Sequence, residues 1–372
     1  MKIANGQTLI QAFESFSPKA YAVEGDKIGL QIGTLNKKVK KVMIALDVIE
    51  PVVDEAVEAG VDLIIAHHPI IFKPIKALRT DQTYGRTIEK LIKNDITVYA
   101  AHTNLDVAPG GVNDLMAEAL GLEETEVLAE TYEDSLKKLV VFVPENEAGK
   151  VRGALGNAGA GFIGNYSHCS FNTKGTGTFK PGEGTDPFIG EQGKMEYVDE
   201  VKIETVFPAS IEKKVIRAVI NSHPYEEVAY DIYDLAVPGD KYGLGRIGRL
   251  KEEMTLKEFA GHVKAAYEVD GVRVTGDLDK LIKKVAVLGG DGNKYVSAAL
   301  FKGADAFVTG DVYYHVAHDA MLEGLAMVDP GHNVEKIMKD GVKRILDGFI
   351  KENNYETEVI SSKMNTDPFK FL

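Results

Sequence analysis

The chain has 372 residues, 44% of them hydrophobic and 27% charged, with a formal net charge of −13. This length predicts two or three domains, and the composition excludes an intrinsically disordered chain. The negative charge excludes a general binder of nucleic acids or anionic membranes, which needs clustered Lys and Arg, but it leaves room for a local site for a small phosphorylated molecule.

Cysteine usage and apolar runs indicate the compartment. The single cysteine, Cys169, excludes an internal disulfide framework and favours a reducing environment. Apolar runs such as VDLIIA have the length of a strand and are too short to span a membrane. The N-terminal segment lacks the unbroken apolar stretch of a signal peptide. We therefore expect a cytoplasmic protein without membrane contact.

The first segment, residues 1–130, reads as alternating strands and helices. Apolar, β-branched runs predict strands at residues 40–47, 61–66 and 96–101. Helices are expected between them, at about residues 50–59, closed by Gly60, and near residues 87–93. Strands separated by helices indicate an α/β domain whose sheet is largely parallel and covered on both faces.

The last segment, residues 239–372, repeats part of this pattern. KKVAVLGG (283–290) and KGADAFVTGD (302–311) match KKVMIALD (40–47) and the stretch around VDLIIAHH, 243 positions earlier without a gap. At this offset His67 falls on Gly310 and His68 on Asp311. The repeat predicts two related half-domains whose strand ends form equivalent corners of one site, since ligands in open α/β sheets sit outside the carboxyl ends of strands.

The segment between the halves, residues 131–238, has another pattern. Strands are expected at residues 137–144, within 162–179, and at 199–207 and 228–235, with helices at 147–157 and 210–221. This β-α-β-β-α-β order predicts an inserted α+β domain of the ferredoxin-like plan, bounded by acidic loops and by VPGDKYG. The Gly- and Pro-rich stretch 174–193 is too long for a tight hairpin and is expected to be a mobile or binding loop.

Histidines and carboxylates follow three of the predicted strands. His67 and His68 leave one strand directly before Pro69; because adjacent strand side chains point to opposite faces, they suit two ions side by side, or one ion if the chain turns. A surface turn with incidental histidines is the alternative. Asp106 follows the next strand and can bridge two cations or cap a helix.

His332 and Glu335 follow the strand-like GLAMVD and the turn at Pro330. Residues three apart on a helix share a face, so this imidazole and carboxylate can converge on one ion, although an exposed polar pair is common. Together with His67, His68 and Asp106, they predict a pair of divalent metal ions. Imidazole suits Zn, Fe, Ni or Mn, so these ligands do not identify the metal; we take Zn as the first expectation.

Two further groups are candidates for chemistry. Asp311 and His315, in GDVYYH, lie one helical turn apart at the end of the repeat strand and are predicted to relay protons or to support ligands. Lys73, Lys76, Arg79 and Arg86 follow the histidine pair and are predicted to bind a phosphate, with a solvated charged loop as the alternative.

The motifs GLQIG, AHHP, HTNLD, TGDVYYH and PGHNVEK occur in this order. With them the whole chain resembles the Nif-three-like proteins, the dinuclear-metal family of GTP cyclohydrolase I type 2 homologues. Its middle segment is similar to the PII-like or CutA-like insert of the longer bacterial members, of the YqfO type. The resemblance implies an α/β sandwich of two half-domains with that insert. It also implies a di-metal site of His67, His68, Asp106, His332 and Glu335, and a toroidal homohexamer.

Two functions are compatible with these features. One is a metal-dependent hydrolase acting on a nucleotide or another phosphorylated compound, in which paired metals generate hydroxide at neutral pH. The other is a non-catalytic metal-binding or regulatory assembly whose PII-like insert senses a ligand. Neither a Walker A motif nor a convincing Rossmann fingerprint occurs in the sequence to select a nucleotide pocket.

Overall fold

The computed structural model describes residues 2–371, which divide into two compact units. The first unit combines residues 1–132 with 242–372, and the second comprises residues 133–241. The N-terminal and C-terminal segments of the chain therefore share one unit, and the middle segment forms the other.

The first unit contains two sheets. The five-stranded sheet has the order β1-β4-β3-β2-β15, and the six-stranded sheet has the order β11-β14-β13-β12-β10-β5. β2, β3, β4 and β15 run parallel, as do β12, β13 and β14, while β1 and β11 are antiparallel edge strands. The strands are β1 (Gly29–Ile32), β2 (Lys41–Ala45), β3 (Leu63–Ala66), β4 (Thr97–Ala100), β5 (Glu123–Asp134), β10 (Asp240–Thr255), β11 (Arg273–Thr275), β12 (Leu281–Asp291), β13 (Ala306–Gly310), β14 (Ala326–Asp329) and β15 (Glu358–Ser361).

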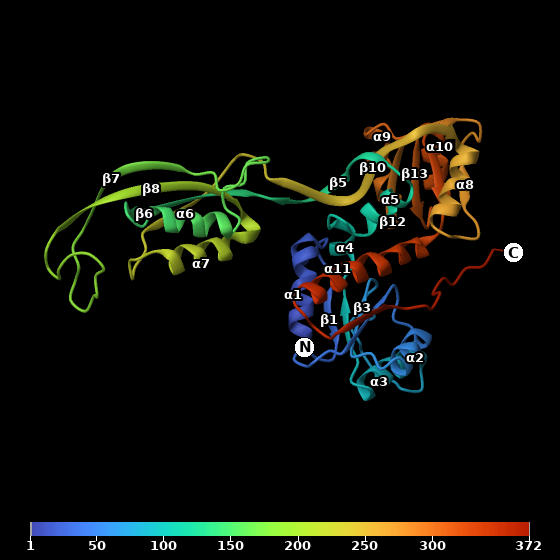
Figure 1. The fold of residues 1–372 in the computed structure, drawn as a ribbon. Coiled ribbons are helices and arrows are strands. Elements are labelled where there is room, and N and C mark those ends of the chain that lie inside the picture. The colour runs from blue at the N-terminus through green and yellow to red at the C-terminus, as the bar shows by residue number, and fades with distance from the viewer. Residues whose placement is uncertain (1, 372) are drawn as a thin grey trace. The chain divides into compact units, whose positions relative to one another are not determined.

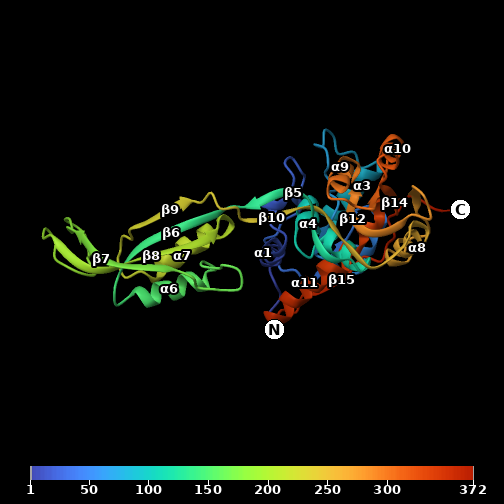
Figure 2. The same cartoon turned by 90° about the horizontal axis from the view of Figure 1, so that it is seen from above.

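Helices cover both faces of these sheets. The main core lies between the sheets and includes residues of α1, α5, α8 and α11; α11 crosses between them in Figure 1. α2 and α3 cover the outer face of one sheet, and α9 and α10 that of the other (Figure 2). The helices are α1 (Gly6–Phe16), η1 (Lys19–Tyr21), α2 (Glu50–Glu58), α3 (Thr83–Lys93), α4 (Thr103–Val107), α5 (Val112–Ala119), α8 (Leu256–Ala266), η3 (Asn293–Tyr295), α9 (Val296–Phe301), α10 (Tyr314–Leu322), η4 (His332–Ile337) and α11 (Met338–Glu352).

Local sequence explains these elements. β2 and β3 are apolar and buried throughout their central residues, as expected of parallel strands covered on both faces. Gly60 and Gly303 follow α2 and α9 with φ of 66° and 71°, the left-handed conformation in which helices commonly end. α8 begins with a complete capping box of Thr255 and Glu258. The resulting mixed α/β fold agrees with the predicted class.

The second unit has a four-stranded antiparallel sheet of order β7-β8-β6-β9. Its chain order is β-α-β-β-α-β, and α6 and α7 lie along one face of the sheet (Figure 1). The elements are β6 (Leu136–Pro144), α6 (Ala148–Asn157), β7 (Phe171–Phe179), β8 (Glu196–Pro208), η2 (Ala209–Ile211), α7 (Glu212–Ser222) and β9 (Tyr230–Asp234).

Three local expectations differ from the structure. In the stretch 174–193, expected to be a loop, residues 174–179 belong to β7 and pair with β8. The acidic residues that precede the middle segment, expected to form a bounding loop, belong to β5, whose Glu and Asp side chains lie mostly on exposed positions of an edge strand. His332 and Glu335 lie on the 3₁₀ helix η4 rather than on an α-helix. Since positions i and i+3 eclipse in a 3₁₀ helix, the two side chains still share one face.

Candidate metal centre

The parallel strands of the first half end at one edge of their sheet. Asp47 follows β2, His67 and His68 follow β3, and His102 follows β4. His67 is fully buried, while His68 and His102 are partly exposed. The carboxyl ends of neighbouring parallel strands thus bring three imidazoles and a carboxylate together.

The second half contributes from β13 and β14. Asp311 follows β13, and η4, which starts three residues after the end of β14, carries His332 and Glu335. Glu335 is only 3% exposed, although it is a carboxylate. An ionised group is buried this far only with compensating partners, so its surroundings define the centre.

Glu335 is the carboxylate on which the histidines converge. Its Oε2 lies 3.0 Å from Nε2 of His68, 3.2 Å from Nε2 of His332 and 3.6 Å from Nε2 of His67. Oε2 of Glu335 therefore faces His67 and His68, which follow β3, and His332 of its own helix η4. Glu335 thus holds the central place among these atoms, and the bridging role expected of Asp106 stays a prediction.

Asp106 lies beside His67 in the most buried part of the cluster. Its Oδ1 is 3.6 Å from Nε2 of His67, and neither atom has a hydrogen-bond partner within residues 2–371. Nδ1 of His67 donates to the carbonyl of Ala101 at 2.9 Å, so Nε2 is the ring atom that faces the cluster. Burying a polar atom without a hydrogen-bond partner costs about 1–3 kcal/mol of folding stability. Nε2 of His67 and Oδ1 of Asp106 each carry this cost.

Carboxylates outside this core orient the other imidazoles through Nδ1. Asp47 binds Nδ1 of His68 at 2.6 Å, Asp311 binds that of His332 at 2.7 Å, and Asp26 binds that of His102 at 2.9 Å. Metal-ligating histidines are commonly held in this way, with the second ring nitrogen bound to a carboxylate or carbonyl. Asp47 also accepts a hydrogen bond from Thr366 near the C-terminus.

The cluster shifts the pKa values of its groups strongly. Burial opposes a charge on His68, but hydrogen bonds to Asp47 and Glu335 outweigh it and raise the pKa to about 10. The hydrogen bond to Glu335 raises the pKa of His332 to about 9. Burial raises the pKa of Asp106 to about 6. Burial also acts to raise the pKa of Glu335, but the surrounding imidazoles reverse this and hold it well below its usual value.

Three overlapping groups of side chains have the spacing needed to hold a cation. They are His67 with His68 and His102; His68 with His332 and Glu335; and His67 with Asp106 and Glu335. All five predicted ligands lie in these groups. His102, which follows β4, is a sixth candidate. Asp26 and Asp47 were missed, although Asp47 ends a predicted strand at the same edge as the histidines, and that position was a signal.

The two predicted proton-relay residues are placed differently. Asp311 has an unusual backbone for a non-glycine residue, with φ of 54°, and its carboxylate accepts from His332. His315 lies on α10, where its ring packs edge-on against Tyr314; within residues 2–371 it has no hydrogen bond or ion pair with the cluster. Asp311 therefore lies against a candidate ligand, and His315 does not.

The predicted phosphate-binding residues lie in and after an exposed loop. Arg79 makes two contacts with Asp81, at 3.1 and 2.6 Å, and Arg86 donates to the carbonyl of Asp81 and to Thr83. Lys73 lies on the rim of an open hollow with Phe72. Arg79 thus has a local partner, Arg86 has local partners and lies 3.7 Å from Glu50, and phosphate binding by this loop stays a prediction.

Comparison with known proteins identifies relatives along the whole chain. The model of the Duf34/NIF3 (NGG1p interacting factor 3) family matches residues 4–368. Proteins named GTP cyclohydrolase 1 type 2 homolog from Halalkalibacterium halodurans and Bacillus subtilis are each 64% identical, over 100% of this chain and of the relative. A crystal structure of a Bacillus cereus protein related to NIF3 is 60% identical, with full coverage of both chains and a TM-score of 0.96. Within the described residues, no helix is both long and apolar enough to cross a membrane.

Proposed function

The chain belongs to the Duf34/NIF3 family, and from this premise we propose that its histidine–carboxylate cluster holds two divalent metal ions. The observation that carries the proposal is the buried pair of His67 Nε2 and Asp106 Oδ1, which lack partners. Two ligands of a tetrahedral ion, each about 2.1 Å from the metal, lie roughly 3.4 Å apart. The 3.6 Å separations of His67 from Asp106 and from Glu335 agree with that spacing.

The second ion is assigned to His68, His332 and Glu335, so that Glu335 is shared. His68 and His332 already have Nδ1 fixed by Asp47 and Asp311, which leaves Nε2 of each directed at Glu335. Mixed imidazole and carboxylate donors suit Zn as well as Fe, Mn or Ni, and Zn remains our first choice.

We propose that the centre serves hydrolysis of a nucleotide or another phosphorylated substrate. A bound metal pair supplies a nucleophilic hydroxide near pH 7 and stabilises negative charge on the reacting oxygens. The protein itself holds the metal-binding side chains in place. Asp311 holds the proton on Nδ1 of His332, and burial of His67 and Asp106 excludes water from the inner side. Among the predicted relay residues, Asp311 has the contact needed and His315 lacks it.

The decisive experiment measures metal content and turnover together. Purified protein loaded with Zn, Mn, Fe or Ni is tested on GTP and on simple phosphoesters. Asp311→Asn is then compared with His315→Ala and with the exposed control Asp319→Asn. At saturating metal, a loss of rate in Asp311→Asn with both metals bound supports the relay. If no combination of metal and substrate turns over, the hydrolase proposal fails, while the metal assignment stands on the metal content alone.

The second candidate function is a non-catalytic regulatory assembly. The β-α-β-β-α-β unit, which we propose to be PII-like, favours it because this unit has a cavity of its own within residues 142–229. A metal-loaded protein that has no hydrolytic activity but binds a small molecule in this unit would support regulation over catalysis.

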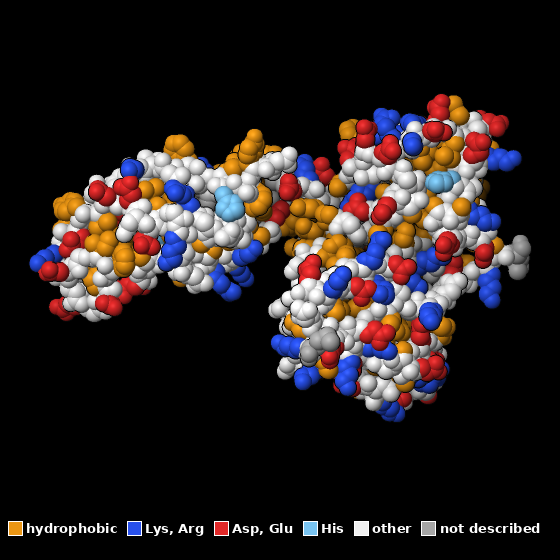
Figure 3. All heavy atoms as spheres, in the orientation of Figure 1, with side chains coloured by type: hydrophobic (Ala, Val, Ile, Leu, Met, Phe, Trp, Pro, Cys, Tyr) orange, Lys and Arg blue, Asp and Glu red, His pale blue; other side chains and the backbone are white. Residues whose placement is uncertain are grey.

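We also propose a homo-oligomer, with the hexamer as the expected form. Large apolar side chains on α9 and α10 support it, since Phe301, Tyr314 and Leu322 are exposed by 92%, 73% and 79%. Charges of both signs are interspersed on the face shown in Figure 3, which fits the absence of general nucleic-acid binding that we expect. Light scattering of Leu322→Glu beside the parent tests the assembly; an unchanged mass would exclude Leu322 from the interface.

A further inference from the structure

The second unit contains a cavity on the sheet face opposite its helices. Val141, Val201 and Ile203 of β6 and β8 point toward α6 and α7 and form the core. Strand side chains alternate, so Phe142 and Glu200 point to the other face. There, β7, residues 180–189 and residues 225–229 enclose about 650 Å³. This volume lies within the range of small-molecule sites, about 300–1,000 Å³.

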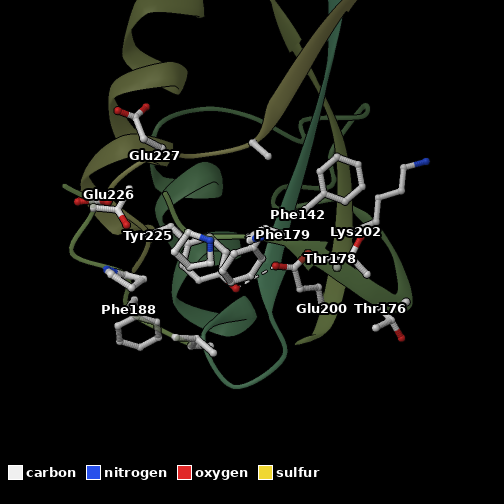
Figure 4. Close-up of a pocket in the computed structure, with 18 of the residues that line it drawn as sticks. Phe142, Thr176, Thr178, Phe179, Phe188, Glu200, Lys202, Tyr225, Glu226 and Glu227 are labelled. Carbon is white, nitrogen blue, oxygen red and sulfur yellow. Dashed lines mark hydrogen bonds between the residues drawn. The ribbon is translucent and has the colours of Figure 1, made fainter. Parts of the chain in front are cut away.

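Aromatic rings form much of the cavity wall. Phe142, Phe179, Phe188 and Tyr225 all line it, and Tyr225 is the centre of the group. The ring of Tyr225 lies 5.7 Å from that of Phe179 and 6.3 Å from that of Phe188. These aromatic side chains come from β6, β7, the long loop and the segment after α7 (Figure 4). Such a wall favours a flat or apolar ligand body.

A single buried carboxylate points into this aromatic group. Glu200 is 8% exposed, and its Oε1 accepts from the hydroxyl of Tyr225 at 3.0 Å. Within residues 2–371 its Oε2 accepts no hydrogen bond from protein. A Cβ on Gly177 would stand 2.1 Å from Oε2, so the glycine leaves the space that this oxygen uses. Within the described residues, Oε1 of Glu200 therefore has a hydrogen-bond donor and Oε2 has none.

The positive charges around the cavity do not neutralise Glu200. Lys174 pairs with Glu145, and Lys202 pairs with Glu204 at 3.2 Å. The Lys202 side chain points away from the aromatic group in Figure 4, and Lys180 is exposed on the rim. The remaining acids, Glu226 and Glu227, are exposed. The charge presented inside the cavity is therefore negative.

We propose that this cavity binds an organic cation, namely a protonated amine or quaternary ammonium group carried on an apolar or aromatic body. The cation lies against Oε2 of Glu200, and the faces of Tyr225 and Phe179 add cation–π attraction. The body fills the space between Phe142 and Phe188. No part of this site involves the metal centre, so its failure leaves the proposed metal function untouched.

Three matched probes, used with the full metal-loaded chain, test separately whether the cavity recognises the positive charge of the ligand and its apolar body. Phenethylamine, 2-phenylethanol and phenylacetate share one ring and differ in charge. Calorimetry should show phenethylamine binding with a Kd below about 1 mM, and at least roughly tenfold more tightly than either of the others, as expected for a hydrogen bond to a charged group. Equal binding of all three probes, or no binding of the amine, would overturn the proposal.

Two variants locate the site, and a third serves as the control. Glu200→Gln keeps an acceptor for Tyr225 and removes the charge, and should weaken phenethylamine by about ten- to a hundredfold without changing 2-phenylethanol. Gly177→Ala crowds Oε2 and should weaken the amine as well. Glu227→Gln, an exposed acid of the rim, should leave binding unchanged. Circular dichroism confirms that each variant is folded. Equal loss in Glu227→Gln, or self-association through this face that excludes every probe, would contradict the assignment.

Discussion

The two halves of the first unit share a frame and differ in the residues at its strand ends. In the first half β2 meets β3 with Val42 opposite Leu63; in the second β12 meets β13 with Val285 opposite Ala306, 243 positions later in both strands. The first half ends its strands with Asp47, His67 and His68. The second half has Gly290, Gly310 and Asp311 at those positions. The two halves thus share their strand pairing and differ in the side chains at the strand ends.

The third strands extend the comparison. Thr97 of β4 and Ala326 of β14 occupy equivalent registers, opposite Leu63 and Ala306. Asp106 and Glu335 each follow nine residues later, on the short helices α4 and η4. Each half therefore supplies one buried carboxylate from the same place. The first half adds mostly imidazoles, and the second adds the helix on which His332 stands beside Glu335.

Gly290 explains why the halves are not identical. A Cβ there would lie 2.7 Å from Oε1 of Glu335 and 3.1 Å from Nε2 of His332. The equivalent residue, Asp47, has a side chain, which binds Nδ1 of His68 and accepts from Thr366.

The largest effect is expected from Glu335→Gln, which removes the atom that both halves share. Metal affinity should fall by more than about a hundredfold, beyond what loss of a supporting residue causes. The metal-free protein should also lose about 3–5 kcal/mol of stability, because protonated His68 and His332 would lose the buried carboxylate at Nε2 and keep only Asp47 and Asp311 at Nδ1. Elemental analysis and thermal unfolding measure both, with the exposed Glu352→Gln as control. Full retention of both metals would refute the shared-ligand assignment.

Gly290→Ala tests the asymmetry itself and should have the next largest effect. Its φ of 63° costs an alanine about 1–3 kcal/mol, and the crowding of Glu335 should in addition lower metal content. Gly303→Ala is the matched control, since its φ is 71° and nothing lies within 4 Å of its added Cβ. Both variants should lose stability, and only Gly290→Ala should lose metal. Similar metal content in the two would show that the open space at Gly290 is not required.

Asp47→Asn and Asp311→Asn compare the supports of the two halves. Each should lower metal affinity by about ten- to a hundredfold, since each holds Nδ1 of one candidate ligand. Competition with a chelator of known affinity measures the change, and the combined variant should show the two losses adding. If Asp311→Asn kept wild-type affinity, the second half would rely on Glu335 alone to position His332.

The release of protons on metal binding should be the smallest of these effects. With pKa values of about 10 for His68 and about 9 for His332, both imidazoles are protonated at neutral pH without metal. Metal ligation requires the neutral ring, so binding should release about two protons and should tighten as pH rises toward these values. Calorimetry in buffers of different ionisation enthalpy counts the protons. Metal affinity that did not change between pH 6.5 and 8.5 would contradict these pKa shifts.

The sequence alone selected five candidate ligands that lie in one cluster, because strand ends are local features and the 243-residue repeat predicted that two sets of them come together. It also predicted the order of elements in the middle segment from turn residues and apolar periodicity. The basic loop was harder to interpret from the sequence. Arg79 and Asp81 are close in sequence, but only the structure shows that they bind each other.

The tertiary structure decided what depends on contacts between distant segments. The central place of Glu335, the support from Asp26 and the link from Thr366 to Asp47 each join residues more than 70 positions apart. Such contacts depend on how two sheets pack around their shared helices, and local patterns carry no record of that packing. The same holds for Glu200 and Tyr225, whose pairing arises only when the segment after α7 folds back onto the open face of its sheet.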